Sequence, residues 1–507
     1  MKTHLLFRPE NEPTCNKVFN EDTLIQDLNL HFLFTEMAQD NSTLYDIVKS
    51  VVLNNLSNPD IILYRQEIVK DGIKNPEAIR DLFAIAADAM REAAYYKEFT
   101  QPNYARVVPV SVRVLKAVGL LEILVDKLEK LKNLTEAFRK SFDSTGLISF
   151  CNRINEYLPN AFFQKAKMHI RDLKYLCEGG KLILGVRIGK GLKGTGYVLR
   201  KLPRDMKDNL LKKRNQKDIQ WNEIILDNIS IAKSAREMED AGLIRILRII
   251  NRFNSIIQHF FGSLRFEAGF YLGSVNLYTT LSSIHAPISF PRPLESGNKS
   301  LCFKGLYDIS LALNEKKKPV QNDIDASGKT LFVITGANQG GKSTFLRSVA
   351  LAQLLMQCGL FVPALEFRSE VCCQLFTHFT REEDAGMNSG KLDEELLRMD
   401  EIIANITPNS ILFMNESFST TTERDGSKIA NDIISALVES GVRVFFVTHL
   451  FEYADAIYSQ DPENVLFLRA GRNKDGNRSF VVSPGEPLKT SFALDLFNHI
   501  LNCSGGV

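Results

Sequence analysis

No two of the eight cysteines are spaced as C-x-x-C, so neither a zinc site nor a disulfide framework is indicated. Charge of one sign is not in excess either: 62 lysines and arginines stand against 60 acidic residues, so overall charge indicates no nucleic-acid partner. No uncharged stretch approaches the length that crosses a bilayer, and the first residues lack a sustained apolar segment. We therefore expect a soluble cytoplasmic protein with reduced thiols and no membrane partner.

The chain is long enough for several hydrophobic cores. Its 507 residues, 44% of them hydrophobic, predict two to four domains. Apolar residues recur at helical spacing from Val110 to Phe142 and again from Ile219 to Phe270, which predicts two long helical regions. Three prolines follow this helical pattern, at Pro287, Pro291 and Pro293. We expect the boundary of a second, chemically active domain near residues 285–300.

A glycine-rich segment in that second domain has the pattern of a phosphate-binding loop. The apolar run Leu331 to Ile334 predicts a buried strand, and the sequence from Thr344 onward predicts a helix. Between them stands Gly336-x-x-x-x-Gly341-Lys342-Ser343. Backbone N–H groups of such a loop face phosphate oxygens at the positive end of the following helix. The order of strand, loop and helix favours this interpretation over a simple glycine-rich turn.

The residue types in the loop suit a nucleotide with a bound cation. Lys342 would neutralise the β- and γ-phosphates, and Ser343 would offer its hydroxyl to Mg²⁺. A second apolar run, Ile411 to Met414, predicts a strand that delivers Asn415 and Glu416 to its carboxyl end, where open α/β sheets bind ligands.

The pair at that strand end departs from the usual sequence of nucleotide hydrolases. The common Asp-Glu pair uses the Asp to assist Mg²⁺ and the Glu to orient the attacking water. Asn415 brings no charge, so metal affinity and hydrolysis rate could both be lower, while Glu416 stays available as a base. A third predicted strand, Val442 to Val447, ends before His449, whose imidazole could contact a γ-phosphate at the same sheet edge.

The segment from Lys165 to Lys217 is the most basic part of the chain, and two apolar runs around a glycine-rich turn predict a β-hairpin inside it. Its lysines and arginines could displace counterions from a nucleic-acid backbone. A solvated charged surface explains the composition equally well. The candidate nucleic-acid contacts are Lys181, Arg187, Lys190, Lys193, Arg200 and Lys201.

These motifs resemble those of the MutS family of DNA mismatch-repair ATPases, whose nucleotide domain is of the ABC type. The resemblance rests on four segments: Thr335 to Arg347, Gln357 to Ala364, Asn415-Glu-Ser with Asp425-Gly426, and Val447-Thr-His449. Val320-x-Asn322-Asp323 is similar to the adenine-side segment of the family. Asp27 to Leu30 and the two helical regions resemble, more weakly, its core and lever region.

The resemblance implies a mixed fold, with a mainly α-helical core and lever region followed by an α/β P-loop ATPase domain. The implied boundaries are a polar segment over residues 1–20, the helical region over 21–295 with the basic hairpin near 165–217, and the ATPase over 296–507. It further implies a short form without mismatch-recognition, connector or C-terminal nuclease domains.

The resemblance also assigns site residues, with ATP and Mg²⁺ as cofactors. Nucleotide contacts would come from Gly336, Ala337, Asn338, Gln339, Gly340, Gly341, Lys342, Ser343, Thr344, Val320 and Asn322. Lys342, Glu416 and His449 would be catalytic, and Ser343, Asn415 and Glu416 would hold the metal. The family closes each site with a loop from a second subunit. Ser389 and Gly390 take that position here, although the surrounding DAGMNSGKL lacks the usual Ser-Thr-Phe pattern.

The expected function is that of a homodimeric, ATP-driven protein that binds DNA, whether duplex, mismatched or branched. ATP would close the composite sites and move the helical levers. Two alternatives stay open at this point. The chain could be a nucleotide-gated clamp or scaffold for a protein partner, or an ATP-binding switch that scarcely hydrolyses, as Asn415 suggests.

Overall fold

The computed structural model describes residues 2–10, 15–97, 108–177, 183–188, 194–200, 229–297, 299–337, 339–381, 390–460, 462–472 and 478–487. Two compact units emerge from its packing. The first comprises Met1–Thr3, Asp81–Arg139 and Cys151–Arg265, and the second comprises His4–Arg80, Lys140–Phe150 and Phe266–Val507. The fold is mixed, with helices dominating the first unit and sheets confined mostly to the second. The domain boundaries read from the sequence stay a prediction.

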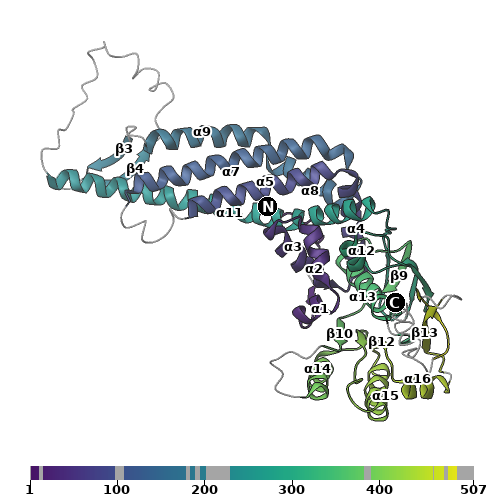
Figure 1. The fold of residues 1–507 in the computed structure, drawn as a ribbon. Helices are drawn as coiled ribbons and strands as arrows, with labels where there is room; N and C mark the ends of the chain where they lie inside the picture. Colours follow the sequence, from purple (N-terminus) through teal and green to yellow (C-terminus); the bar gives the residue numbers. More distant parts are fainter. Residues whose placement is uncertain are drawn as a thin grey trace, which may run out of the picture. The chain divides into compact units, whose positions relative to one another are not determined.

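The first unit is built from long helices (Figure 1). They are most of α5 (Pro76–Lys97), α7 (Val110–Phe138), the second half of α8 (Thr145–Tyr157), α9 (Asn160–Cys177) and the first part of α11 (Ile229–Ser283). The predicted amphipathic helix from Val110 is confirmed as α7, which buries Leu124, Leu128 and Leu131 and runs alongside α9. The antiparallel strands β3 (Ile183–Ile188) and β4 (Gly194–Arg200) form a hairpin.

The second predicted helical region extends further in the structure at its C-terminal end. Residues 219–228 lie outside the described part of the chain, and α11 continues beyond Phe270 to Ser283. The continuation follows from burial in the second unit, where Tyr271, Val275 and Leu277 are almost fully enclosed. The Tyr271 hydroxyl donates to the carbonyl of Leu5 at 2.5 Å. Within the described ranges, no helix is both long and apolar enough to cross a membrane.

A six-stranded sheet forms the centre of the second unit. Its strand order is β10 (Leu375–Phe379), β11 (Ile411–Asn415), β12 (Arg443–Val447), β8 (Leu331–Thr335), β13 (Val465–Arg472) and β14 (Arg478–Pro484). The first five strands are parallel, and β14 is antiparallel to β13. Every residue of β8, β10 and β12 is buried, as parallel strands covered on both faces require.

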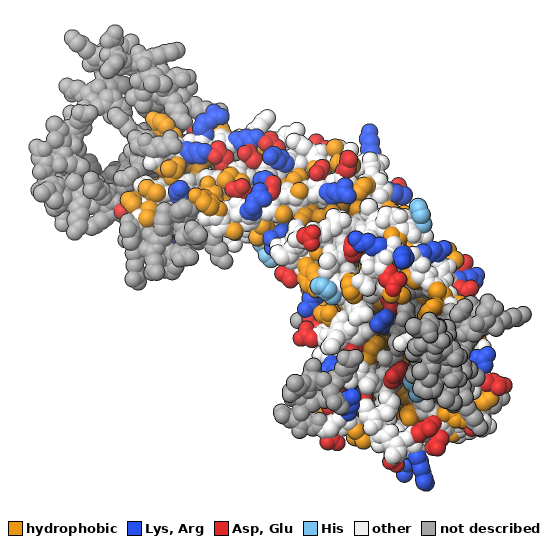
Figure 2. Space-filling view, in the orientation of Figure 1, with side chains coloured by type: hydrophobic (Ala, Val, Ile, Leu, Met, Phe, Trp, Pro, Cys, Tyr) orange, Lys and Arg blue, Asp and Glu red, His pale blue; other side chains and the backbone are white. Residues whose placement is uncertain are grey.

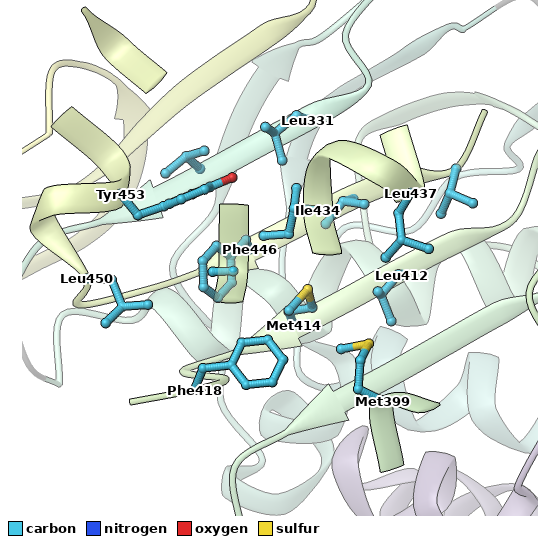
Figure 3. Close-up of a cluster of buried hydrophobic side chains, with 14 of the residues drawn as sticks. Leu331, Met399, Leu412, Met414, Phe418, Ile434, Leu437, Phe446, Leu450 and Tyr453 are labelled. Carbon is cyan, nitrogen blue, oxygen red and sulfur yellow. The ribbon is translucent and has the colours of Figure 1, made fainter. Parts of the chain in front are cut away.

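Helices cover both faces of this sheet. Helices α14 (Lys391–Asn405), α15 (Glu423–Glu439) and α16 (Phe451–Tyr458) pack on one face, where Met399, Ile434 and Tyr453 meet Leu412 and Phe446 (Figure 3). Helix α13 (Lys342–Cys358) contributes no residue to that core but contacts β11 and β12. It therefore covers the opposite face.

The second unit also contains a smaller sheet and several short helices. A four-stranded sheet has the order β5 (Arg292–Leu294), β9 (Glu366–Glu370), β6 (Leu301–Leu306) and β7 (Asn322–Asp325), and α12 (Ile309–Glu315) follows β6. The early helices are α1 (Glu21–Asp27), α2 (Leu30–Ala38), α3 (Ser42–Val52) and α4 (Pro59–Lys74), with β1 (Cys15–Lys17) paired to β2 (Asn54–Leu56). Residues 4–80 thus share a unit with the six-stranded sheet.

Candidate nucleotide-binding site

The strand register brings the three predicted site segments to one edge of the sheet. Asn415 at the end of β11 lies opposite Val447 of β12, and Val447 lies opposite Ile334 of β8. Because these strands are parallel, the residues that follow them leave the sheet side by side at its carboxyl edge, where α/β proteins bind ligands. The glycine-rich loop, Glu416 and His449 are therefore neighbours.

The glycine-rich loop has a backbone that only glycine adopts easily at two positions. Gly336 has φ of +122° and Gly341 has φ of +92°, both in the left-handed region. A Cβ on Gly340 would lie 2.9 Å from the Ala337 carbonyl oxygen, closer than side chains approach. The loop thus folds tightly and exposes backbone N–H groups at the start of α13, which suits a phosphate group. Asn338 lies outside the described residues.

The Lys342 ammonium points back into this loop. Its Nζ donates to the carbonyl oxygens of Gly336 and Ala337, each at 3.0 Å, and only 4% of the residue is exposed. Burial lowers the pKa of Lys342, and the charge of Glu416 opposes that effect. A buried ammonium whose contacts are neutral carbonyls would gain strongly from an anionic phosphate.

Two of the three predicted metal ligands, Ser343 and Asn415, are in direct contact. Ser343 Oγ donates to Asn415 Oδ1 at 2.8 Å, so a hydroxyl and an amide oxygen meet beside the loop. Both are the hard oxygen ligands that Mg²⁺ prefers. Among the described residues, no group of three His, Cys, Asp or Glu side chains could hold a metal. The residues fit a Mg²⁺ that completes its coordination with phosphate oxygens and water.

Glu416 and His449 form the other polar pair of the site. His449 Nε2 lies 3.2 Å from Glu416 Oε1, and the Glu416 backbone N–H donates to the Val447 carbonyl at 2.8 Å. The hydrogen bond with His449 is the main reason why the pKa of Glu416 is lowered, although burial acts in the opposite direction. Glu416 therefore stays a carboxylate at neutral pH, which is the form that can orient a water molecule.

The backbone of Glu416 is held in an uncommon conformation. Its φ of +58° lies in the left-handed region, and Phe418 two residues later has φ of +63°. Such conformations cost roughly 1–3 kcal/mol each and persist where the surroundings determine them. They cluster at functional sites, which makes this turn part of the candidate site.

A cavity of about 480 Å³ opens beside the loop, within the usual range for a small-molecule site. Of the predicted residues it is lined by Val320, Asn322, Glu416 and the loop residues Gln339, Gly340, Gly341, Lys342, Ser343 and Thr344. Gly336, Ala337, Asn415 and His449 are not among the residues that line it. Asn322 is largely buried, and its Oδ1 accepts the Val482 N–H at 2.7 Å, which links β7 to β14.

Phe480 is a lining residue that the sequence analysis missed. It lies on β14, is 45% exposed and has φ of +57°. A bulky residue in this conformation is unusual and invites a functional explanation. No local motif surrounds it in the sequence, so only the fold brings it to the loop.

The predicted nucleic-acid residues and second-subunit loop stay predictions. Gly390 is the N-cap of α14, while Ser389 lies outside the described residues. Arg187 and Arg200 lie on β3 and β4, and Lys181, Lys190, Lys193 and Lys201 lie outside the described part.

Two basic residues in the described part of the 165–217 segment are already paired. Lys167 Nζ lies 2.6 Å from Glu129 Oε2, and Lys174 pairs with Glu122. Figure 2 shows basic and acidic side chains interspersed along the helices of the first unit. This pairing favours a solvated charged surface for residues 165–177.

The site and its sheet define a class: an α/β domain whose glycine-rich loop and polar side chains meet at the carboxyl edge of a mostly parallel sheet. Comparisons with known proteins then specify the family. The family model of MutS domain V matches residues 332–481, and that of the MutS2 N-terminal domain matches residues 57–284. The chain belongs to the MutS family, as the motifs predicted.

Individual relatives are similar over part of the chain. The DNA mismatch repair protein MutS of Shouchella clausii is 27% identical over 230 residues, which cover 42% of this chain and 26% of that protein. The Thermus aquaticus protein of the same name is 30% identical over 186 residues, covering 37% and 22%. MutS protein homolog 4 of Mus musculus is 28% identical over 179 residues, covering 34% and 19%. The chain thus spans about a quarter of the length of these relatives or less.

Proposed function

We propose that this chain is an ATPase that binds DNA, in which ATP binding and hydrolysis gate a dimeric clamp. The observation that supports it best is the meeting of Lys342, the Ser343–Asn415 pair and the Glu416–His449 pair at one sheet edge. These are the groups that phosphoryl transfer to water requires. The relatives whose names state DNA mismatch repair support the DNA part of the proposal.

Each residue has a defined task in this proposal. Lys342 neutralises the terminal phosphates, while the loop N–H groups orient them. Ser343 and Asn415 hold Mg²⁺, which when bound would offset the negative charge of the phosphates. Glu416 orients and deprotonates the attacking water, and His449 fixes the Glu416 carboxylate through its Nε2 contact. Gly390 of a second subunit would close the site.

Asn415→Asp tests whether the neutral amide of Asn415 weakens Mg²⁺ binding and slows hydrolysis. At about 4 Å, a carboxylate attracts the cation more strongly than a neutral amide does, by an interaction energy of roughly 1–4 kcal/mol. We therefore expect the Mg²⁺ concentration for half-maximal turnover to fall by about fivefold or more, with a higher turnover number. A Mg²⁺ titration of ATP hydrolysis measures both.

Asn409→Asp, in the turn before β11, is the matched control because it adds the same charge away from the loop. Unchanged Mg²⁺ dependence in Asn415→Asp would show that the amide suffices, and the hypothesis that Asn415 lowers metal affinity and hydrolysis would be wrong.

Coupling between the two ligands is the direct consequence of the proposal. ATP can gate DNA binding only if it binds the DNA-bound and DNA-free states with different affinity. DNA affinity measured without nucleotide, with ADP and with ATP should differ between the nucleotide states. Absence of binding at low salt in all three states would contradict the proposal.

The lysines of the hairpin segment give a second test of DNA binding. Replacing Lys190, Lys193 and Lys201 together by glutamine should weaken DNA binding, since each phosphate contact releases counterions. If all three contact phosphates, the slope of log K against log salt should become less steep by about 2–3 units. Fluorescence anisotropy at four salt concentrations measures the slope.

A matched variant replaces three exposed lysines outside the segment, Lys2, Lys130 and Lys428, and changes the net charge equally. Equal slopes for both triple variants would mean that the segment is a solvated surface and that DNA binds elsewhere.

A further inference from the structure

The turn after β11 is held by contacts that the phosphate site itself does not explain. Glu416, Ser417 and Phe418 form this turn, and the first and third have left-handed backbones. Ser417 and Phe418 are completely buried, while Glu416 lies at the cavity. A turn of this kind needs partners that fix it, since isolated residues rarely adopt such conformations.

Each of the three turn residues has a partner from β10, from the residue after it, or from α14. Thr380 Oγ1 donates to the Glu416 carbonyl at 2.9 Å. His378 Nδ1 lies 2.7 Å from Ser417 Oγ. The Phe418 N–H donates to Glu395 Oε2 at 2.8 Å. The turn is therefore bonded at every residue to elements that precede it in the chain.

The hydrogen bonds of His378 define its tautomer. Its Nε2 lies 3.0 Å from the Glu395 carbonyl oxygen, which can only accept, so Nε2 carries the proton. Burial, with help from Arg398, lowers the pKa of His378 to about 4, so the ring is neutral at pH 7. Nδ1 is then an acceptor that faces the Ser417 hydroxyl, and this hydroxyl also donates to the His378 carbonyl at 2.9 Å. The imidazole bridges α14 and the turn.

Glu395 makes the more direct connection. It lies in the first half of α14, is 2% exposed, and uses one carboxylate oxygen for the Phe418 N–H. One turn later, Arg398 Nη2 donates to the Phe379 carbonyl at 3.0 Å, which ties the same helix to the end of β10. Helix α14 begins directly after Gly390. The position of α14 and the conformation of the Glu416 turn are thus linked through the side chains of Glu395 and His378.

We propose that Glu395 and His378 are positioning residues for ATP hydrolysis, which hold the Glu416 turn in its left-handed conformation and connect it to α14. The inference rests on the proposed ATPase function. Neither residue lines the cavity, so both act through Glu416 rather than on the nucleotide. Loss of either should therefore reduce hydrolysis and leave ATP binding largely intact.

Glu395→Ala and Glu395→Gln separate positioning from folding. Alanine removes the acceptor of the Phe418 N–H, so we expect the turnover number to fall by about 10–100-fold with KM for ATP within about threefold, because small misplacements of catalytic groups cost this much. Glutamine keeps an acceptor oxygen at the same place and should restore turnover to within about fivefold of the native chain. Ser417→Ala removes the hydroxyl that contacts both His378 Nδ1 and the His378 carbonyl, and should lower turnover by about tenfold with unchanged KM.

A double-variant cycle shows whether Glu395 acts through Glu416. In a Glu416→Ala background, Glu395→Ala should cause no further loss, because the residue that it positions is absent. Glu401→Ala, at an exposed position of the same helix, is the control and should turn over normally.

The possible outcomes are distinct. A native chain that does not hydrolyse ATP contradicts the proposed function and this inference together. Native turnover that Glu395→Ala and Ser417→Ala leave unchanged contradicts this inference alone. A loss from Glu395→Ala that glutamine does not restore, or that adds in full to the loss from Glu416→Ala, also overturns it. Should Glu395→Ala not fold, Ser417→Ala and Glu395→Gln still decide, since a role in positioning requires reduced turnover in the former and near-native turnover in the latter.

Discussion

Replacing Glu416 by alanine should lower ATP turnover by about 10²–10⁴-fold, the usual contribution of a positioned general base. Glu416 is the carboxylate at the end of β11 that faces the cavity, and its contact with His449 keeps it ionised. ATP affinity should change little, because the loop and Lys342 bind the phosphates. Single-turnover hydrolysis and equilibrium nucleotide binding measure the two effects separately.

Two further variants make the Glu416 result specific. Glu416→Gln keeps the size of the side chain without its charge and should be nearly as inactive as alanine. Glu439→Ala, at the exposed end of α15, should behave like the native chain. Substantial turnover in Glu416→Gln would show that another group activates the water.

Replacing Lys342 by methionine should weaken ATP binding strongly. Hydrogen bonds to charged groups contribute about 1.5–3 kcal/mol each, so losing the ammonium should weaken binding by about 100-fold. In the native chain ATP should raise the melting temperature, because it binds only the folded state, and this shift should disappear in Lys342→Met.

Without nucleotide, we do not expect Lys342→Met to lower the stability of the folded chain. Because burial lowers the pKa of Lys342, its charged form is less favourable in the folded than in the unfolded state, and the charge lowers the free energy of unfolding at neutral pH. Lys342→Met should therefore melt no lower than the native chain when ATP is absent. Lys428→Met, on the exposed face of α15, controls for the loss of a surface charge. If ATP still raised the melting temperature of Lys342→Met, Lys342 would not be part of the nucleotide site.

The central part of the fold could be predicted from local sequence. The apolar run of β8, the glycines and the periodic α13 are contiguous, so their order alone specifies strand, loop and helix. Asn415, Glu416 and His449 follow short apolar runs, and parallel pairing necessarily brings such strand ends together.

Contacts between distant segments could not be predicted in this way. Arg65 Nη1 donates to the Cys358 carbonyl at 3.1 Å across 293 positions, which places α4 at the end of α13. No periodicity in residues 4–80 indicates that they pack with the six-stranded sheet. His378 and Glu395 were missed for the same reason: neither belongs to a local motif, and the partner of each lies at the Glu416 turn.

The most direct test of the account is ATP turnover measured with and without single-stranded, duplex, mismatched and four-way-branched DNA at two salt concentrations. We predict that at least one DNA form changes the turnover number, that the effect weakens at the higher salt, and that Glu416→Ala abolishes turnover throughout. If no DNA form changed the turnover number of a chain that still binds ATP, the DNA-gated account would be contradicted. That result would favour a clamp that acts on a protein partner.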